Sequence, residues 1–318
     1  MKKRKIGIIG FRGQAARIRK ILKKNNKVEI NKILYHKKLK IKNSIITQNF
    51  NDLLNLDAII IASPTYTHLE YLKKLKNYKG YILIEKPVIN SLSQYKVINN
   101  LYRNKKSKIM INYNFNYSKI FFTLKKILKQ NKYGKPIKAF ISTNHGLAFK
   151  KNNGWRFNSK LCKGVGEMVS CHFIKFASTL FGDIKKFYKI ESNFSKKTKR
   201  NNFDTINLNM LTKKGVIVNI FNSYSTPFIN YIKIFLTNGL IIYDGKEMLI
   251  HHPRDSFDKK KRFKSPPIIN KYKMPFDKIW TESLNESLNV FIKTLYKGKK
   301  FSKYEFESSL KAALPIVK

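Results

Sequence analysis

Cysteine is scarce in this sequence, with only Cys162 and Cys171 among 318 residues. Their spacing matches neither a zinc site nor a disulfide framework, so we expect no metal centre and a reducing, cytoplasmic environment. Long hydrophobic runs are missing too. None approaches the roughly 18 to 20 residues that a membrane-spanning helix needs, and the basic first residues lead into a strand pattern instead of a signal peptide. We therefore expect a soluble protein that is neither exported nor bound to a membrane.

Acidic residues and arginine are also few. Asp and Glu number 18 against 66 Lys and Arg, which gives a formal charge of +48, and only nine of the basic residues are Arg. Such a charge points to nucleic acid as a partner. However, Arg is the residue favoured for bidentate phosphate and base contacts, and the Lys residues are spread along the whole chain. Lys, Asn and Ile are all in excess, so we favour codon bias in an AT-rich genome over specific nucleic-acid binding.

The chain is long enough for two ordinary domains, and its pattern changes near residue 117. Before that point, helical segments alternate with short apolar runs that predict buried strands over 5–10, 28–35, 57–62, 82–87 and 108–113. Residues 1–117 are therefore predicted to form a Rossmann-type, doubly wound parallel sheet. Residues 118–318 are predicted to form an α+β domain with a large, mostly antiparallel open sheet, whose strands are expected over 185–193, 205–212, 215–223, 231–236 and 240–243. The segment 251–273, rich in Pro and Lys, predicts a mobile surface excursion.

A glycine turn follows the first predicted strand and opens a helix. Its candidate cofactor residues are Gly10, Phe11, Arg12, Gly13 and Ala15. They stand where a dinucleotide fingerprint directs helix N–H groups at the pyrophosphate. Gly10 supplies the tight turn, whereas Arg12 replaces the usual second glycine and is a candidate to pair with the pyrophosphate. After the second strand, His36 and Lys37 replace the acidic residue that binds the ribose 2′-hydroxyl, which favours NADP over NAD.

Two further loops lie at the same predicted edge of the sheet. The loop after the strand 57–62 contains Ser63, Pro64, Thr65 and His68, and it fits a proline turn with a helix cap as well as it fits cofactor contact. The next strand ends at Glu85, Lys86 and Pro87. Ligands bind beyond the carboxyl ends of strands in such sheets, so Lys86 can reach a cofactor or substrate. A single lysine at a strand end is otherwise more often a surface residue.

Taken together, these residues resemble the family of glucose-fructose oxidoreductase, inositol dehydrogenase and MocA oxidoreductases. The resemblance spans nearly the whole chain and rests on the Gly10 turn, the Ser63 loop with His68, Glu85-Lys86-Pro87, Asn112-Tyr113-Asn114 and a glycine-rich segment that ends in His172. It implies an NAD- or NADP-dependent enzyme that oxidises or reduces a sugar, an inositol or a nucleotide-linked sugar. It also implies cofactor contact at Glu85, Lys86 and Asn114, and a homo-oligomer formed through the second-domain sheet.

His172 is the candidate catalytic residue of the second domain. In a helix predicted over 167–180, the spacing places His172 on an apolar face with Val169, Phe173 and Phe176, where a histidine is more often a packed core residue. The resemblance favours catalysis instead, because an imidazole with a pKa near 6.5 suits proton exchange with a sugar hydroxyl.

Lys86 is the second candidate catalytic residue. It is predicted to hydrogen-bond the same substrate oxygen as His172 and to stabilise its developing negative charge. Trp155 and Arg156 are candidates for substrate contact, and a solvated loop pair is an equally good interpretation of them.

The sequence departs from the family pattern at two positions. Met168 lies one turn before His172, where family members commonly carry Asp, and a thioether cannot relay a proton. The adjacent Glu167 is rotated by about 100° from that position on an α-helix. Asn116 stands where many members carry Arg. A catalytically degenerate dinucleotide-binding protein is therefore the alternative to a sugar dehydrogenase, and a basic nucleic-acid-binding protein is a more remote one.

Overall fold

The structure, a computed structural model, describes residues 2–37, 45–104, 106–149, 154–196 and 202–318. The chain divides into two compact units. The first is Met1–Asn114 together with Leu284–Lys318, and the second is Phe115–Ser283. The boundary between Asn114 and Phe115 lies close to the expected domain boundary after residue 117. The C-terminal segment differs from expectation, because it belongs to the first unit and not to the second.

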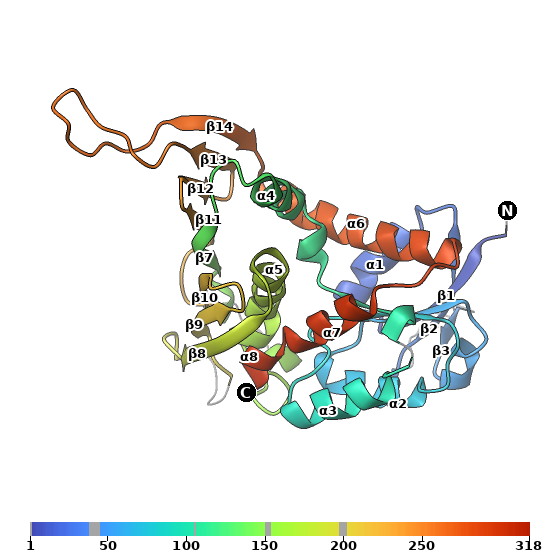
Figure 1. Ribbon diagram of the computed structural model, residues 1–318. Coiled ribbons are helices and arrows are strands. Elements are labelled where there is room, and N and C mark those ends of the chain that lie inside the picture. The colour runs from blue at the N-terminus through green and yellow to red at the C-terminus, as the bar shows by residue number, and fades with distance from the viewer. Residues whose placement is uncertain (1, 38–44, 105, 150–153, 197–201) are drawn as a thin grey trace. The chain divides into compact units, whose positions relative to one another are not determined.

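The first unit is built on a parallel sheet of six strands (Figure 1). The order β3-β2-β1-β4-β5-β6 comprises β3 Ile46–Thr47, β2 Val28–Leu34, β1 Arg4–Ile9, β4 Ala58–Ile61, β5 Tyr81–Glu85 and β6 Ile109–Asn112. Every residue of β4, β5 and β6 is buried, as expected for a sheet with helices on both faces. The predicted doubly wound fold is thus confirmed, with the short strand β3 added at its edge.

Helices lie on both faces of this sheet. The helix α1 (Gln14–Leu22) lies on one face, and α2 (His68–Lys74) and α3 (Leu92–Leu101), which contact each other, lie on the other (Figure 1). The 3-10 helices η1 (Phe50–Leu53), η2 (Thr65–Thr67) and η3 (Lys106–Lys108) lie in the connections. From the end of the chain, α7 (Lys303–Lys311) contacts β6 and α3, and α8 (Leu314–Val317) follows it.

Long-range contacts explain why the C-terminal segment belongs to the first unit. The hydroxyl of Tyr81 donates to the carbonyl of Lys299 at 2.8 Å, and the amide of Phe301 donates to the carbonyl of Ser107 at 2.7 Å. The Phe301 ring also contacts the Tyr81 ring edge to face, with centroids 6.2 Å apart. Within the segment, Phe301 stacks on Phe291 of α6 (Phe276–Tyr296), with centroids 6.0 Å apart. Local periodicity carries no information about such pairings, so the sequence alone placed residues 284–318 in the second domain.

The second unit contains a sheet of eight strands in the order β14-β13-β12-β11-β7-β10-β9-β8. These are β7 Pro136–Asn144, β8 Ile184–Ser192, β9 Thr205–Thr212, β10 Ile217–Ser223, β11 Ile229–Leu236, β12 Gly239–Tyr243, β13 Glu247–His251 and β14 Ile268–Lys273. All neighbours are antiparallel except β7 and β10. The predicted mostly antiparallel sheet is confirmed, and the structure adds β7, β13 and β14 to the strands that the sequence indicates.

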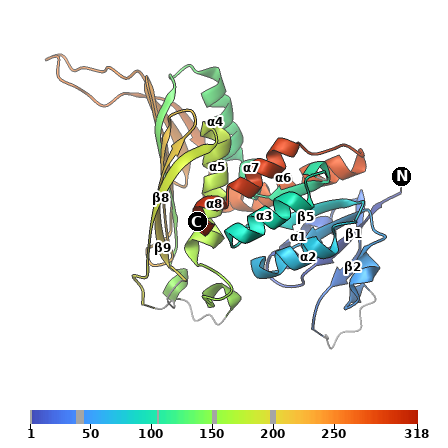
Figure 2. The same ribbon diagram turned by 60° about the horizontal axis from the view of Figure 1, so that its bottom comes forward.

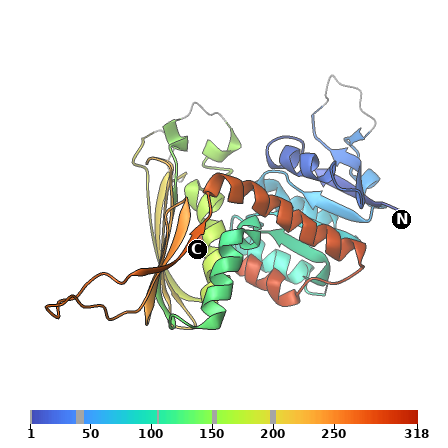
Figure 3. The same ribbon diagram turned by 90° about the horizontal axis from the view of Figure 1, so that it is seen from above.

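One face of this sheet is covered by α4 (Lys119–Gln130) and α5 (Cys171–Phe181), which contact each other (Figures 2 and 3). The opposite face carries exposed apolar side chains at alternate strand positions, including Tyr188, Ile190, Ile217 and Phe235. Within the described ranges, no helix of the second unit covers them. None of the helices described is both long and apolar enough to cross a membrane.

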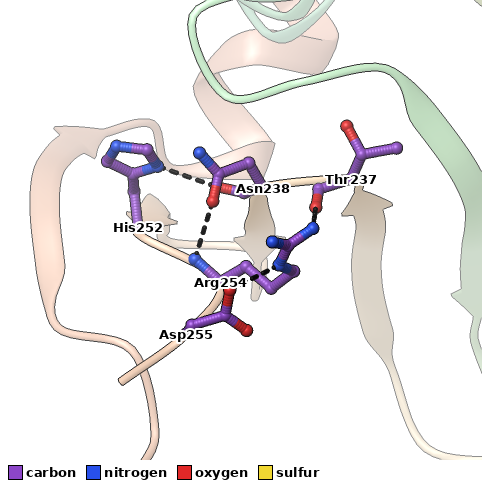
Figure 4. A network of polar contacts seen from close by, with 5 residues as sticks. All are labelled: Thr237, Asn238, His252, Arg254 and Asp255. Carbon is purple, nitrogen blue, oxygen red and sulfur yellow. Dashed lines mark hydrogen bonds and ion pairs between the residues drawn. The ribbon is translucent and has the colours of Figure 1, made fainter. Parts of the chain in front are cut away.

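Residues 252–267 form a long excursion between β13 and β14 (Figure 1). Asn238 holds its base, because its carbonyl oxygen lies 2.7 Å from Nδ1 of His252 and its Oδ1 accepts the amide of Arg254 at 2.9 Å (Figure 4). Farther out, Phe257 and Phe263 form an isolated antiparallel bridge. The prediction of a continuous excursion to residue 273 is wrong, since the last six residues are the edge strand β14, paired with β13.

Candidate active site

The glycine turn between β1 and α1 has the geometry of a phosphate cradle. Gly10 has a φ of +115°, and a Cβ there would lie 2.8 Å from the carbonyl oxygen of Ala62, so only glycine fits. Beside Gly13, a Cβ would meet nothing within 4 Å. The helix α1 has no side-chain cap and no acidic residue in its first turn, which leaves its first N–H groups able to bind an anion. The turn therefore fits the pyrophosphate of a dinucleotide.

Phe11 is held in that turn by its neighbours. Its carbonyl oxygen accepts a hydrogen bond from Nη2 of Arg19 at 2.8 Å, and the guanidinium lies 4.1 Å from the centroid of its ring. The ring also lies 5.1 Å from that of Tyr35 at the end of β2. Next along the chain, His36 and Lys37 are exposed, as is Arg12 in the turn, and the roles expected of these three at the cofactor stay predictions.

Glu85, at the end of β5, connects the glycine turn to the neighbouring strand. Its Oε1 accepts hydrogen bonds from Nδ2 of Asn112 at 2.7 Å and from Nε2 of Gln14 at 3.3 Å. Burial raises the pKa of Glu85, although these two bonds and the charge of Lys86 act in the opposite direction. The carboxylate thus ties the start of α1 to the strand that carries Lys86.

His68 connects the next two loops of the first unit. It is only 1% exposed, and its Nδ1 lies 3.0 Å from the carbonyl oxygen of Pro87 while its Nε2 lies 2.9 Å from that of Ser63. Burial lowers the pKa of His68 to about 4, even though both carbonyls favour the charged ring. Because backbone groups engage both nitrogens, His68 holds the loop after β4 against the turn that follows Lys86.

The remaining cofactor candidates of the first unit lie along the same edge. The strands β4, β5 and β6 are parallel neighbours, so the loops after them meet at their carboxyl ends. Ser63, Pro64 and Thr65 follow β4, the half-buried Lys86 follows Glu85, and the buried Asn114 follows β6. In open α/β sheets this is the edge at which ligands bind.

In the second unit, His172 lies in the first turn of α5 and is 3% exposed. A π-helix, Gly166–Ser170, precedes α5, and the amide of Cys171 donates to the carbonyl of Gly166, five residues earlier. The continuous α-helix predicted over 167–180 is therefore wrong at its start. Angles based on 3.6 residues per turn, including the rotation of about 100° expected between Glu167 and the Met168 position, do not apply across this segment.

The segment before His172 is anchored to the sheet. Oγ of Ser170 donates to Oδ1 of Asn222 on β10 at 2.7 Å, and Nδ2 of Asn222 donates to the carbonyl of Thr143 on β7 at 2.9 Å. Gly164 has a φ of +88°, and a Cβ there would collide with the carbonyl of Phe203. Glycine at position 164 is thus required for the close approach of this segment to the chain that leads into β9.

A neighbour of His172 that the sequence analysis missed is Trp280 in α6. The two rings lie 5.6 Å apart with an interplanar angle of 74°, an edge-to-face contact. Phe276, one turn earlier, lies 5.9 Å from Trp280, and Phe115 contacts both. Aromatic residues at positions i and i+4 are a visible sequence signal, but ordinary core packing produces the same pattern.

Trp155 and Arg156 lie together in the 3-10 helix η6 (Trp155–Phe157). The Arg156 guanidinium is 5.1 Å from the indole centroid, and the carbonyl of Arg156 accepts a hydrogen bond from Nδ2 of Asn202 at 2.7 Å. Both side chains are half-buried. Their contact with a substrate stays a prediction.

Comparison with protein families decides the class. Residues 4–113 match the model described as an oxidoreductase family with an NAD-binding Rossmann fold, and residues 121–242 match the GFO/IDH/MocA C-terminal domain. The chain belongs to the Gfo/Idh/MocA oxidoreductase family. The resemblance read from the sequence is confirmed, and with it an NAD(P)-binding Rossmann domain.

Other members and neighbours are distant in sequence. An uncharacterized oxidoreductase of Schizosaccharomyces pombe is 24% identical over 143 residues, and the match spans 44% of this chain and 39% of that protein. The structure of a levoglucosan dehydrogenase with NADH and levoglucosan gives a TM-score of 0.81 at 15% identity, over 98% of this chain and 95% of the other. The structure of a 3-ketoreductase from Actinomadura kijaniata with NADP and TDP-benzene gives a TM-score of 0.79 at 16% identity, over 98% of this chain and 95% of the other. At such identities the likeness shows the shared fold.

The Gfo/Idh/MocA chain shows no sign of a metal centre in the part that the structure describes, since no three His, Cys, Asp or Glu side chains there are grouped to hold an ion. The groups that fit a dinucleotide all lie in the first unit, at one edge of its sheet. His172 and its aromatic neighbour Trp280 lie in the second unit.

Proposed function

We propose that this Gfo/Idh/MocA oxidoreductase transfers a hydride between a nicotinamide cofactor and a hydroxyl-bearing carbon of a sugar or nucleotide-linked sugar. The observation that carries the proposal is the glycine turn that fits a pyrophosphate, at the same sheet edge as Lys86. NAD(P), when bound, supplies or accepts the hydride. The levoglucosan bound to one structural neighbour supports a sugar as the substrate class.

The catalytic roles fall to one residue of each unit. His172 exchanges the proton of the substrate hydroxyl, and Lys86 donates a hydrogen bond to the same oxygen, which stabilises its developing negative charge. Glu85 positions Lys86 through the end of β5. Trp155 and Arg156 contact the substrate, and Arg156 pairs with a phosphate or carboxylate where the substrate carries one.

The cofactor is held by the first unit. The proposed contacts are those of the turn and loops, namely Gly10, Phe11, Arg12, Gly13, Ala15, His36, Lys37, Ser63, Pro64, Thr65, Glu85, Lys86 and Asn114, with His68 positioning two of the loops. Binding of NADP is favoured because His36 and Lys37 occupy the positions where an acidic residue would bind the ribose 2′-hydroxyl of NAD. The two structural neighbours carry NADH and NADP, so both cofactors belong in the test.

We also propose a cytoplasmic homo-oligomer that forms through the uncovered sheet face of the second unit. The exposed apolar residues on that face, including Tyr188 and Ile217, support this assignment. Light scattering after size exclusion tests it, and the substitution Ile217→Glu is expected to dissociate the oligomer into monomers.

Titration with NADH and NADPH, followed by turnover assays against a panel of sugars and nucleotide sugars, tests the proposed activity. Turnover by the wild type that is lost in Lys86→Met supports it. Cofactor binding without any turnover supports the degenerate alternative, which is motivated by Met168. Tight duplex binding with a steep salt dependence and no cofactor affinity supports the nucleic-acid alternative.

A further inference from the structure

The excursion 252–267 combines positive charge with exposed aromatic rings. It contains six Lys and Arg residues against two Asp, which gives it a formal charge of +4. All three ribbon views show it projecting away from the sheet of the second unit (Figures 1, 2 and 3). The proposed hydride transfer makes no use of it.

Hydrogen bonds order the excursion along its length. At its base, the amide of His252 donates to the carbonyl of Pro267 at 3.2 Å, and Asn238 fixes the same end (Figure 4). Farther out, the amide of Lys264 donates to the carbonyl of Ser256 at 2.8 Å. The excursion is therefore a defined hairpin that presents its outer residues in one arrangement.

We call residues 257–264 the tip of the excursion. Asp258 shapes it, because its Oδ1 accepts the amides of Lys260 at 2.9 Å and of Arg262 at 3.0 Å. The Arg262 guanidinium also pairs with this carboxylate, with Nη2 2.7 Å from Oδ2, so the two charges offset each other. The other cations of the tip are exposed and form no ion pair among the described residues; they are Lys259, Lys260, Lys261 and Lys264.

Two aromatic rings flank these charges. Phe257 and Phe263 face each other across an antiparallel bridge, with ring centroids 5.1 Å apart. Phe257 is 52% exposed and Phe263 is 87% exposed. The two rings therefore form an apolar knob that the chain itself leaves in water, which is the mark of a surface that contacts a partner.

The chemistry of the tip requires a partner that offers negative charge and an apolar medium side by side. An anionic lipid bilayer does so, since phosphate groups cover its surface and hydrocarbon lies just beneath them. Nucleic acid fits less well, because the one arginine of the tip is held by Asp258 and lysine lacks the fork that reads base edges. A second copy of the chain carries a formal charge of +48 and repels the tip.

We propose that the tip docks the protein on the surface of a bilayer that contains anionic lipids. The four lysines contact headgroup phosphates, while Phe257 and Phe263 enter the boundary between the headgroups and the acyl chains. Such a contact needs no spanning segment. The proposal goes beyond the hydride transfer, and it replaces the expectation, drawn from the missing hydrophobic runs, that the protein does not bind a membrane.

Sedimentation with vesicles tests the role of the lysines. The whole protein is expected to bind phosphatidylcholine vesicles that contain about one third phosphatidylglycerol, to bind them less in about 0.5 M NaCl, and not to bind pure phosphatidylcholine. Lys259→Gln combined with Lys260→Gln should lower the partition coefficient about 30-fold, since each lysine near an anionic surface contributes a factor of about 5.

The matched control combines Lys126→Gln with Lys129→Gln, two exposed lysines of α4 in the same unit. It removes the same charge and is expected to change the partition coefficient less than about 3-fold. Equal losses in the two double variants would assign the binding to the diffuse charge of the chain and overturn the proposal, as would no binding to anionic vesicles.

Insertion of the rings has its own readout. Phe263→Trp places a fluorescent reporter in the tip, and Phe122→Trp places one on α4, where the side chain is 52% exposed. After subtraction of the wild-type emission, anionic vesicles are expected to shift the first reporter to shorter wavelengths and to leave the second unchanged. Phe263→Ser should weaken sedimentation about 10-fold. An unshifted Phe263→Trp overturns the proposal even where the protein sediments.

Competition separates lipid from nucleic acid. An oligonucleotide that binds more tightly than the vesicles, and whose binding is weakened in Phe263→Ser, would assign the tip to nucleic acid and overturn the lipid contact. Turnover of a sugar without vesicle binding refutes the docking role alone. Vesicle binding that depends on the tip, without turnover in any assay, supports docking and refutes the proposed activity.

Discussion

Nδ2 of Asn112 lies 2.7 Å from Oε1 of Glu85, at the carboxyl ends of two adjacent parallel strands. This bond is the largest of the interactions that offset the burial of the carboxylate, and yet the pKa of Glu85 remains raised. The ionised form is therefore less stable in the folded chain than in the unfolded one. Stability that Glu85 contributes is present below its unfolded pKa and is lost as pH rises through the folded pKa.

Asn112→Ala removes the main donor to this carboxylate. The folded pKa of Glu85 then rises further, so we expect a loss of about 1 to 3 kcal/mol in the free energy of unfolding at pH 8 and a smaller loss at pH 5. Urea unfolding at the two pH values measures the difference. Gln14→Ala, which removes the longer bond of 3.3 Å, is the control with a smaller expected effect. An equal loss at both pH values contradicts the argument.

His68 titrates in the opposite sense. Its folded pKa of about 4 lies below the ordinary value of 6.5, so its contribution is present above pH 6.5 and is lost as pH falls through about 4. The shift corresponds to about 3 kcal/mol at most. The difference in unfolding free energy between wild type and His68→Gln should shrink by up to this amount between pH 7 and pH 4. A difference that is constant with pH would show that the ring is not held neutral.

The two glycines of the phosphate turn should respond differently to alanine. Gly10→Ala combines a collision with Ala62 and an unfavourable φ, so we expect a loss of about 3 kcal/mol or more and NADH affinity reduced by more than about 10-fold. Gly13→Ala meets no atom, but its φ of +54° with a ψ of −118° lies outside the left-handed helical region, so backbone strain alone is expected to cost roughly 1 to 3 kcal/mol, less than strain and collision together at Gly10. Thermal unfolding of both variants measures the loss of stability, and titration with NADH measures the loss of cofactor affinity. Equal damage from the two substitutions would contradict the cradle geometry.

Lys86→Met and His172→Asn should separate catalysis from cofactor binding. Each is expected to lower kcat by about 10² to 10⁴-fold. His172→Asn should leave the Kd of NADH or NADPH within about 3-fold, whereas Lys86→Met should also weaken cofactor binding, because Lys86 is a proposed cofactor contact. His172→Asn should also remove the limb of the pH–rate profile that reports the base. Lys96→Met, an exposed lysine of α3, is the matched control and should change neither quantity. Full activity in His172→Asn would remove that residue from the mechanism.

The sequence predicts the parallel sheet well because its signals are local. The strands β4 and β5 are unbroken apolar runs, and Gly10 meets a backbone requirement set within its own turn. By contrast, β7 lies at the centre of the second sheet but was missed. It starts at Pro136 and carries outward-facing Lys138, and its identity as a strand comes from pairing with β10 and β11, which lie far away in sequence.

The candidate site follows the same division. Spacing places the residues of the glycine turn and the end of β5 at one edge of the sheet, whereas their roles come from the family resemblance and stay predictions. The contact of Trp280 with His172 joins positions more than a hundred residues apart, and the π-helix before α5 has no signature in residue type. Such features arise from tertiary packing, which overrides local preference.

The return of the chain end to the first unit has a consequence for synthesis. A ribosome translates β1 to β6 before the second unit, but the helix α7 that contacts β6 and α3 follows the second unit in the chain. The nascent first unit must therefore wait, with part of its apolar surface uncovered, until the whole second unit has been translated. A premature stop codon shortly before codon 303 would thus damage a unit whose six strands had already been made.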